Sequence, residues 1–181
     1  MNIRRLILLI LLPALAACAG VAPQGAPMRP IAAPPIYSPT PTRVDFVLVQ
    51  KSRRTLTLYA AGTPIKTYRG LQFGDAPTGH KSFEGDERTP EGLYLIDYRN
   101  PRSSYHLSLH ISYPDEEDRA FAAAHGRSPG GAIFIHGQPN WLEEGQRIAG
   151  DWTDGCIALS NAEIEELWDA IPDGTPIEIR P

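Results

Sequence analysis

A cysteine and a histidine stand in the sequence where nucleophilic catalysis would require them. His136 ends the apolar run Ile133-Phe134-Ile135, and twenty residues later Cys156 follows a glycine and precedes another apolar run. A thiol is a weak nucleophile until it loses its proton, and a neighbouring imidazole can accept that proton and later pass it to a leaving amine. The pair therefore predicts a nucleophile at Cys156 and a general base, then acid, at His136.

The residues before Cys156 predict a turn that a substrate can approach closely. Thr153, Asp154 and Gly155 precede the cysteine, and glycine lets the backbone come near a substrate. The backbone N–H groups of Gly155 and Cys156 are therefore expected to face a developing oxyanion. A nucleophile, a base and oxyanion donors from two short segments indicate acyl transfer.

The number of cysteines also favours a reactive Cys156. The chain has two cysteines, and Cys18 stands directly behind an N-terminal export signal. If Cys18 carries lipid, Cys156 has no intramolecular disulfide partner, and an unpaired thiol in an exported protein indicates a reactive role. The alternative is a small buried apolar side chain, and the residues that flank Cys156 favour reactivity.

Two motifs resemble the catalytic domain of L,D-transpeptidases of the YkuD type. The first is His136-Gly137 followed by the stretch Thr153-Asp154-Gly155-Cys156-Ile157-Ala158-Leu159, and the second is a Thr-Pro-x-Gly-x-Tyr pattern within residues 85–94. The cysteine motif with its spaced histidine is specific, whereas the upstream motif alone would be weak. The resemblance extends over about residues 44–180.

The resemblance implies a role for each matching residue. It gives the cysteine and the histidine the roles stated above, and it makes the carbonyl of Gly137 the group that orients the imidazole. Arg88, Tyr94 and Trp141 are expected to line the substrate groove, because they lie in the upstream motif or in the loop over the site. No cofactor and no metal ion are implied.

Two positions depart from the family pattern. Asp154 stands where many members have histidine, and Ala158 where many have arginine. Asp154 could hold the loop, bind a substrate amine or contact His136. Because a carboxylate beside a thiolate raises the pKa of the thiol, we expect Asp154 to point elsewhere. The two changes leave the nucleophile intact and leave open what receives the acyl group.

The rest of the chain predicts a mainly β domain that positions these residues. Short apolar segments between Gly, Pro and polar turns indicate strands, at residues 44–49, 55–59, 65–73, 92–98, 105–113, 132–136, 157–160 and 176–180. The first two predict a hairpin. We expect a β-sandwich-like or mixed sheet assembly, as the resemblance also implies, in which the strands of His136 and Cys156 pair antiparallel.

Two short helices are expected in addition. Residues 115–124 begin with Asp115 and further acidic residues, as the helix dipole favours, and stop before Gly126. The second helix begins with the capping box Ser160-Asn161-Ala162-Glu163. Its apolar residues follow at helical spacing and are expected to pack in the core: Ile164, Leu167, Trp168 and Ile171.

The N-terminus predicts export and a lipid anchor. Arg4 and Arg5 precede an apolar run and a small-residue stretch, as in secretory signal peptides, and Leu15-Ala16-Ala17-Cys18 resembles the lipobox of bacterial lipoproteins. The alternative is an ordinary secretory signal with an incidental cysteine. Ala19, where an aspartate would favour the inner membrane, indicates the outer membrane of a Gram-negative envelope.

These signals divide the chain into three parts. Residues 1–17 are the predicted lipoprotein signal peptide, and residues 18–42 are the lipidated cysteine and a proline-rich linker. Such a linker is extended and could reach on the order of 70 Å from the membrane. Residues 43–181 are the predicted L,D-transpeptidase-like catalytic domain.

The charge and the histidine positions limit the kinds of binding partner that the sequence predicts. The formal net charge is −4, with 17 basic and 21 acidic residues, so no basic surface for nucleic acid is predicted. His106 and His110 are four residues apart in a predicted strand and could face the same way beside Asp97 or Asp115, but no HExxH or CxxC pattern supports a metal site. The expected partners are peptidoglycan stem peptides and the membrane, through the lipid on Cys18.

Three functions follow from these residues and the resemblance. The leading one is an L,D-transpeptidase, in which a thioester on Cys156 is resolved by an amine. The close alternative is hydrolysis of the thioester, which would make the protein a carboxypeptidase or an amidase that acts on peptidoglycan or on peptidoglycan–protein links. The third is a non-catalytic lipoprotein that binds the cell wall, and it requires an inert Cys156.

Overall fold

The structure, a computed structural model, describes residues 43–181. The predicted signal peptide and the predicted lipidated linker with Cys18 lie outside the described residues and stay predictions. Within residues 43–181, no helix is long and apolar enough to cross a membrane.

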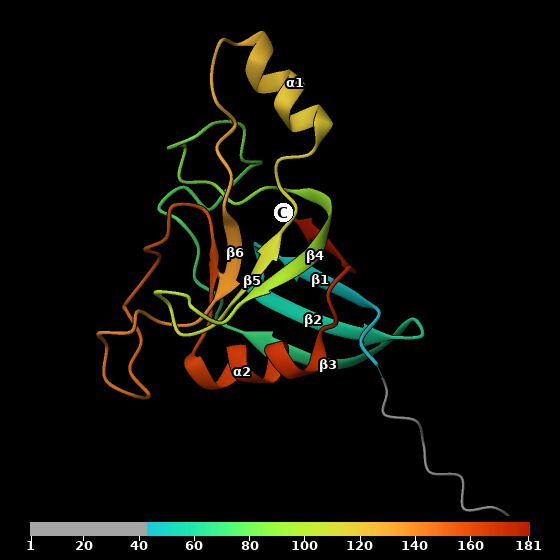
Figure 1. Cartoon of the computed structure of the whole chain (residues 1–181), viewed down its shortest axis with the longest axis vertical. Helices are drawn as coiled ribbons and strands as arrows, with labels where there is room; N and C mark the ends of the chain where they lie inside the picture. Colours follow the sequence, from blue (N-terminus) through green and yellow to red (C-terminus); the bar gives the residue numbers. More distant parts are fainter. Residues whose placement is uncertain (1–42) are drawn as a thin grey trace, which may run out of the picture. The chain divides into compact units, whose positions relative to one another are not determined.

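Residues 43–181 form one mixed sheet of eight strands and two helices (Figure 1). The strands are β1 (Phe46–Gln50), β2 (Thr55–Ala60), β3 (Thr63–Arg69), β4 (Gly92–Asn100), β5 (Ser108–Ile111), β6 (Ile133–His136), β7 (Ile157–Ala158) and β8 (Thr175–Arg180). Their order across the sheet is β3-β2-β1-β8-β4-β5-β6-β7. The mainly β fold class predicted from the sequence is confirmed.

Alternating burial explains the first half of the sheet. In the β1–β2 hairpin, Val47, Val49, Leu56 and Leu58 are buried, and polar or half-buried residues alternate with them. Period-two alternation of this kind places one face of a strand in the core. The C-terminal strand β8 then enters the sheet between β1, with which it is parallel, and β4, with which it is antiparallel.

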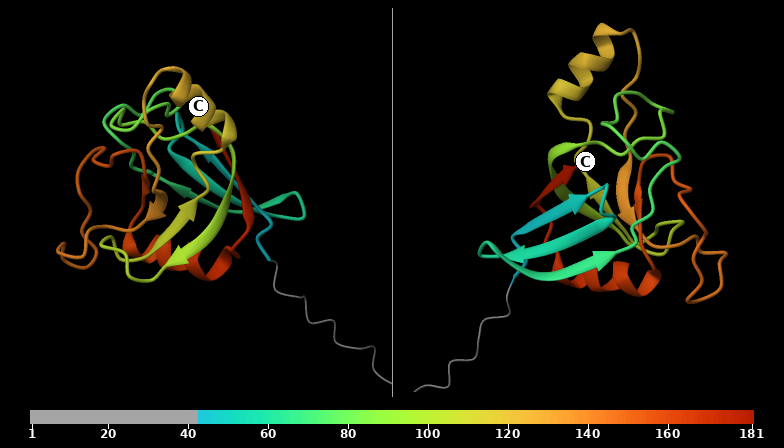
Figure 2. Two further views of the ribbon diagram at one scale, coloured as in Figure 1. Left: turned by 45° about the horizontal axis from the view of Figure 1, so that its top comes forward. Right: turned by 180° about the vertical axis from the view of Figure 1, so that it is seen from behind.

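The two helices differ in how they pack. Helix α2 (Asn161–Ala170) has the predicted capping box of Ser160 and Glu163, and its apolar side packs against β5 and β6 with Ile164 and Leu167 buried. Helix α1 (Glu116–Ala124) is capped by Asp115 and buries only Asp118 and Ala122. The right view of Figure 2 shows α1 standing away from the sheet.

The pairing of β6 and β7 corrects one prediction. Strands β6 and β7 are parallel, with Ile135 opposite Ile157, and not antiparallel. The long loop between them carries the chain back to the level at which β6 began, which a short hairpin turn could not do. The other edge of β7 is bridged by Gln72, whose N–H and C=O both bond Ala158.

Three predicted strands are shorter than expected. The segment 65–73 leaves the sheet after Arg69, the segment 157–160 pairs only at Ile157 and Ala158, and the segment 105–113 pairs only over Ser108–Ile111. His106 lies before that last strand with a φ of 64°. It therefore does not share a strand face with His110, as the sequence had suggested.

Candidate active site

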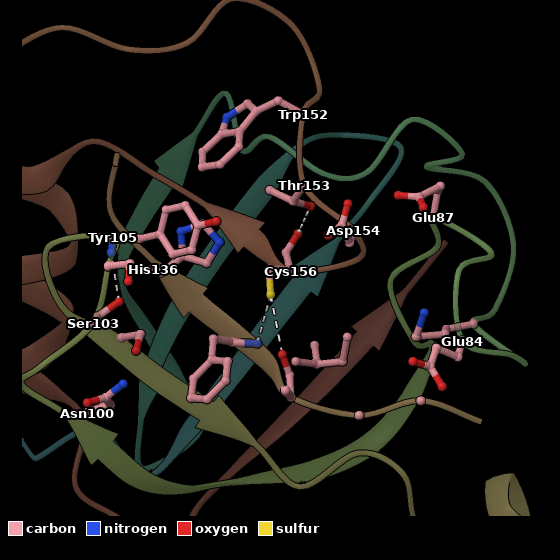
Figure 3. Close-up of a pocket in the computed structure, with 18 of the residues that line it drawn as sticks. Glu84, Glu87, Asn100, Ser103, Tyr105, His136, Trp152, Thr153, Asp154 and Cys156 are labelled. Atoms are coloured by element: carbon pink, nitrogen blue, oxygen red, sulfur yellow. Dashed lines mark hydrogen bonds between the residues drawn. The ribbon is translucent and has the colours of Figure 1, made fainter. Parts of the chain in front are cut away.

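Cys156 and His136 line one cavity of about 690 Å³ (Figure 3). The register of β6 and β7 explains this, because Ile135 and Ile157 are paired and their side chains enter the core. The residues that precede and follow them therefore point to the opposite face. Phe134, His136 and Cys156 share that face and open into the cavity.

The Cys156 thiol is held by the backbone of the neighbouring segment. Its Sγ accepts a hydrogen bond from the N–H of Phe134 at 3.4 Å and donates to the carbonyl of Ala132 at 3.6 Å. Burial raises the pKa of the thiol to about 11; the Phe134 N–H opposes this shift, and the negative charge of Asp154 adds to it. At neutral pH the resting side chain is therefore the thiol and not the thiolate.

The His136 imidazole is oriented by the next residue. Its Nδ1 lies 2.7 Å from the carbonyl oxygen of Gly137, and because a carbonyl can only accept, Nδ1 carries the proton and Nε2 keeps its lone pair. Burial lowers the pKa of His136 to about 4, and the bond to Gly137 only partly offsets this. The imidazole is thus neutral at physiological pH and able to accept a proton.

Two aromatic side chains cover the imidazole. The ring centroids of Tyr105 and Trp152 lie 4.7 Å and 5.5 Å from that of His136, and the two rings also contact each other. Only 3% of His136 is exposed. Neither aromatic is predicted from the sequence as a site residue, although Trp152 directly precedes the Thr153 motif.

In this resting arrangement, Sγ bonds the β6 segment and not the imidazole. Catalytic hydrogen bonds are often formed only when substrate is bound. The thiol must turn from the Ala132 carbonyl before Nε2 can take its proton. The site can therefore supply a nucleophile whose deprotonation is coupled to attack, rather than a preformed thiolate.

The turn before Cys156 is closed by Thr153. Its Oγ1 donates to the carbonyl of Cys156 at 2.8 Å and accepts from the N–H of Gly155 at 3.3 Å. The Gly155 N–H, predicted as an oxyanion donor, is therefore already engaged. The N–H of Cys156 forms no such bond within residues 43–181 and is the better donor for an oxyanion.

Position 155 requires glycine for two reasons, its backbone conformation and the lack of space for a side chain. Its φ is +123°, and a Cβ built on it would lie 2.4 Å from the carbonyl oxygen of Arg88. We expect Gly155→Ala to destabilise the fold by about 3 kcal/mol or more, since backbone strain and overpacking each cost about 1–3 kcal/mol. Gly70→Ala is the matched control: its φ is +71° but its Cβ would meet nothing within 4 Å.

Urea unfolding of both glycine variants measures this difference. Gly70→Ala is expected to lose only about 1–2 kcal/mol, the cost of a left-handed backbone in an alanine. Equal losses in the two variants would show that the contact between Gly155 and the Arg88 carbonyl is not what the turn depends on.

The sequence predicts that the Asp154 side chain points away from the thiol, and this prediction is wrong. It lines the cavity between Cys156 and Glu87 (Figure 3). Desolvation and the negative charge of Asp154 raise the pKa of Glu87. Asp154 is largely exposed, so water screens its charge, and this is why a carboxylate is tolerated so near the thiol.

The three predicted groove residues lie outside the cavity wall. Tyr94 is 4% exposed and donates to Asp118 at 3.1 Å, beneath helix α1. The Arg88 side chain lies beside Gly79, and only its carbonyl contacts the catalytic turn. Trp141 is 76% exposed. Motif membership predicted their neighbourhood in the sequence but not the direction of their side chains.

The remaining polar positions are also accounted for. Ala158 is fully buried in β7 opposite His136, so an arginine would not fit there. His106 pairs with Glu165 at 2.7 Å and His110 with Asp97 at 2.6 Å. The two histidines that could have shared a metal site are thus occupied separately.

The family model described as the YkuD L,D-transpeptidase catalytic domain matches residues 44–179. The chain belongs to the L,D-transpeptidase family. The curved mixed sheet with two helices is the fold of this family. No curated protein sequence matches the chain.

Two solved structures place this L,D-transpeptidase domain among its relatives. The helical cell shape determining protein Pgp2 from Campylobacter jejuni is 29% identical with a TM-score of 0.60, over 75% of this chain and 47% of Pgp2. Bd1075 from Bdellovibrio bacteriovorus is 26% identical with a TM-score of 0.53, over 76% of this chain and 48% of Bd1075. The chain thus spans about half the length of each.

Proposed function

We propose that this L,D-transpeptidase family member is a cysteine-dependent acyl-transfer enzyme that acts on peptidoglycan stem peptides. The observation that carries the proposal is a neutral His136 with a free Nε2 in the same cavity as the Cys156 thiol. Family membership supports the substrate class.

The reaction uses two steps at the same carbonyl carbon. As Sγ of Cys156 attacks the carbonyl of an L-to-D (or meso-diaminopimelate-to-D) link, Nε2 of His136 takes the thiol proton. The C–N bond breaks, the imidazolium protonates the leaving amine, and a thioester and a free D-residue result. An acceptor amine then attacks the thioester, loses its proton to His136 and regenerates the thiol.

The pH dependence of kcat/KM tests whether Cys156 and His136 rest as a neutral thiol and a neutral imidazole. Below pH 4 the imidazole of His136 is protonated and cannot accept the thiol proton, so kcat/KM should fall; the thiol of Cys156 ionises only near its pKa of about 11. We expect kcat/KM to be constant from about pH 5.5 to about pH 9. A narrow bell with limbs near pH 6 and pH 8 would contradict a neutral resting pair.

Hydrolysis is the second candidate, and one observation favours it. Asp154 and Glu87 line the cavity on the side of Cys156 away from His136 (Figure 3), where a carboxylate could take a proton from an attacking water. The enzyme would then be a carboxypeptidase or an amidase that releases crosslinked proteins.

Product analysis on purified muropeptides separates the two. Crosslinked dimers from a tetrapeptide donor and a tripeptide acceptor are expected for transfer, and trimmed monomers for hydrolysis. Neither product, together with an unmodified Cys156, would favour the non-catalytic wall-binding role.

We also propose that the enzyme is exported and anchored through a lipid on Cys18, in the outer membrane of a Gram-negative envelope. The N-terminal signal supports this. The similarity to Pgp2, whose name describes helical cell shape determination, supports a role in shaping the wall. Metabolic labelling with a palmitate analogue should tag the protein, and Cys18→Ala should abolish the tag.

A further inference from the structure

An ion pair between a residue far from Cys156 in sequence and one close to it anchors the loop that covers His136. Arg54, in the turn between β1 and β2, forms a two-pronged contact with Asp151, at 2.7 Å to Oδ1 and 2.6 Å to Oδ2. The guanidinium also donates to the carbonyl of Leu71 at 3.0 Å. Paired parallel bonds of this kind fix direction as well as distance.

The carboxylate of Asp151 is also tied to the backbone. Its Oδ1 accepts from the N–H of Phe73 at 2.9 Å, and the carbonyl of Phe73 accepts from the N–H groups of Trp152 and Thr153 at 2.9 Å and 3.0 Å. The side chain of Asp151 is 14% exposed. Residue 151 is therefore held at a fixed point next to Trp152.

Trp152 is the part of this arrangement that reaches the base. Its ring lies edge-on to the His136 ring at 5.5 Å and contacts Tyr105, the other cover of the imidazole. Burial is the main cause of the low pKa of His136. Any movement of Trp152 that admits water would thus change how the base titrates.

We propose that Arg54 and Asp151 are a positioning pair, which holds Trp152 against His136 and keeps water from the general base. The role rests on the proposed function, because it concerns the base of that reaction. Neither residue touches the reacting atoms. The pair acts through the placement of Trp152.

The titratable and charged groups around His136 do not explain its lowered pKa. Tyr105 and Cys156 are the titratable side chains at the ring, and His106 lies near Gly137 but is paired with Glu165. The charged groups of the cavity wall are Lys81, Glu84, Glu87, Arg102 and Asp154. Within the described residues none of these hydrogen-bonds the imidazole, so exclusion of water dominates.

The fold should survive loss of the pair. Gln72 holds the earlier part of the same loop through the carbonyls of Ile148 and Gly150, and Gln138 holds it through the N–H of Ile148. Both amides are buried and also bond each other at 3.1 Å. Removing the carboxylate therefore removes the side-chain restraint next to Trp152, while the bond from the Trp152 N–H to the Phe73 carbonyl and the rest of the loop remain.

The test compares Asp151→Asn and the milder Arg54→Lys with the wild type. We expect the His136 pKa, followed by NMR of the imidazole, to rise from about 4 toward the value of an exposed histidine, about 6.5. We expect kcat/KM at pH 5 to fall about tenfold relative to its value at pH 8. Trp152→Ala should reproduce both shifts.

The matched control is Lys66→Met, which breaks the exposed pair with Glu166 and should move neither quantity. A loss of activity that is equal at every pH, with an unchanged imidazole pKa, would overturn the proposal and leave the pair a merely structural contact. So would wild-type behaviour in both variants. The NMR titration needs no substrate, so it distinguishes failure of this proposal from failure of the proposed reaction.

Discussion

Cys156→Ala is expected to abolish both the acyl-enzyme and all peptidoglycan products. The thiol lies in the same cavity as a base with a lone pair that is free within residues 43–181. Loss of an enzyme nucleophile costs about 10³-fold or more in kcat. Muropeptide turnover, read by chromatography and mass spectrometry, measures the loss.

Two controls accompany this variant. Thermal unfolding should show a native fold, because Sγ contributes only two weak hydrogen bonds, to Phe134 and Ala132. Ser52→Ala, which removes an exposed hydroxyl bonded to the C-terminal residue Pro181, should keep full activity. Turnover that persists in folded Cys156→Ala would assign the chemistry to another group.

His136→Gln is expected to lower kcat/KM by about 10²–10⁴-fold, the range for a lost general base. Because the thiol has a raised pKa near 11, an enzyme without this base should regain rate as pH rises toward that value. Rates from pH 6 to pH 10.5 would show this as a slope of about one in log kcat/KM.

The histidine control is His125→Gln. His125 follows helix α1, where its Nδ1 bonds the carbonyl of Phe121, and its loss should leave the rate and the pH profile unchanged. A flat profile in His136→Gln, with a small loss of activity, would mean that the thiol is activated by a group other than the imidazole.

The sequence predicts that His136 and Cys156 lie near each other, and they line one cavity, because the spacing and the flanking residues of the motif are local signals. His136 ends an apolar strand and Cys156 precedes one, and although the strands run parallel, β7 pairs over only Ile157 and Ala158, so Cys156 stays near the level of His136. The orienting carbonyl of Gly137 follows from the same motif. Both helices are likewise local signals, the first through Asp115 and the second through its capping box, and the structure confirms both helices.

The remainder depends on contacts that no local pattern encodes. The contact of Arg54 with Asp151 joins residues 97 positions apart, and the direction of β7 depends on the path of a long loop. Tyr94, Arg88 and Trp141 show the same limit, since a motif gives their position but tertiary packing decides where each side chain points. The Asp154 carboxylate can face the cavity without a paired cation because the side chain is exposed and water screens its charge.

The most direct test of the account is the intact mass of the protein after mixing with a peptidoglycan tetrapeptide that ends in a D-residue. If Cys156 is the nucleophile, the protein gains the mass of the stem peptide without its terminal D-residue, located by proteolysis on Cys156 and absent in Cys156→Ala. The added mass should disappear when an acceptor amine or water resolves the thioester. No adduct on Cys156 under conditions in which the substrate is consumed, or an adduct on another residue, would show that Cys156 is not the nucleophile.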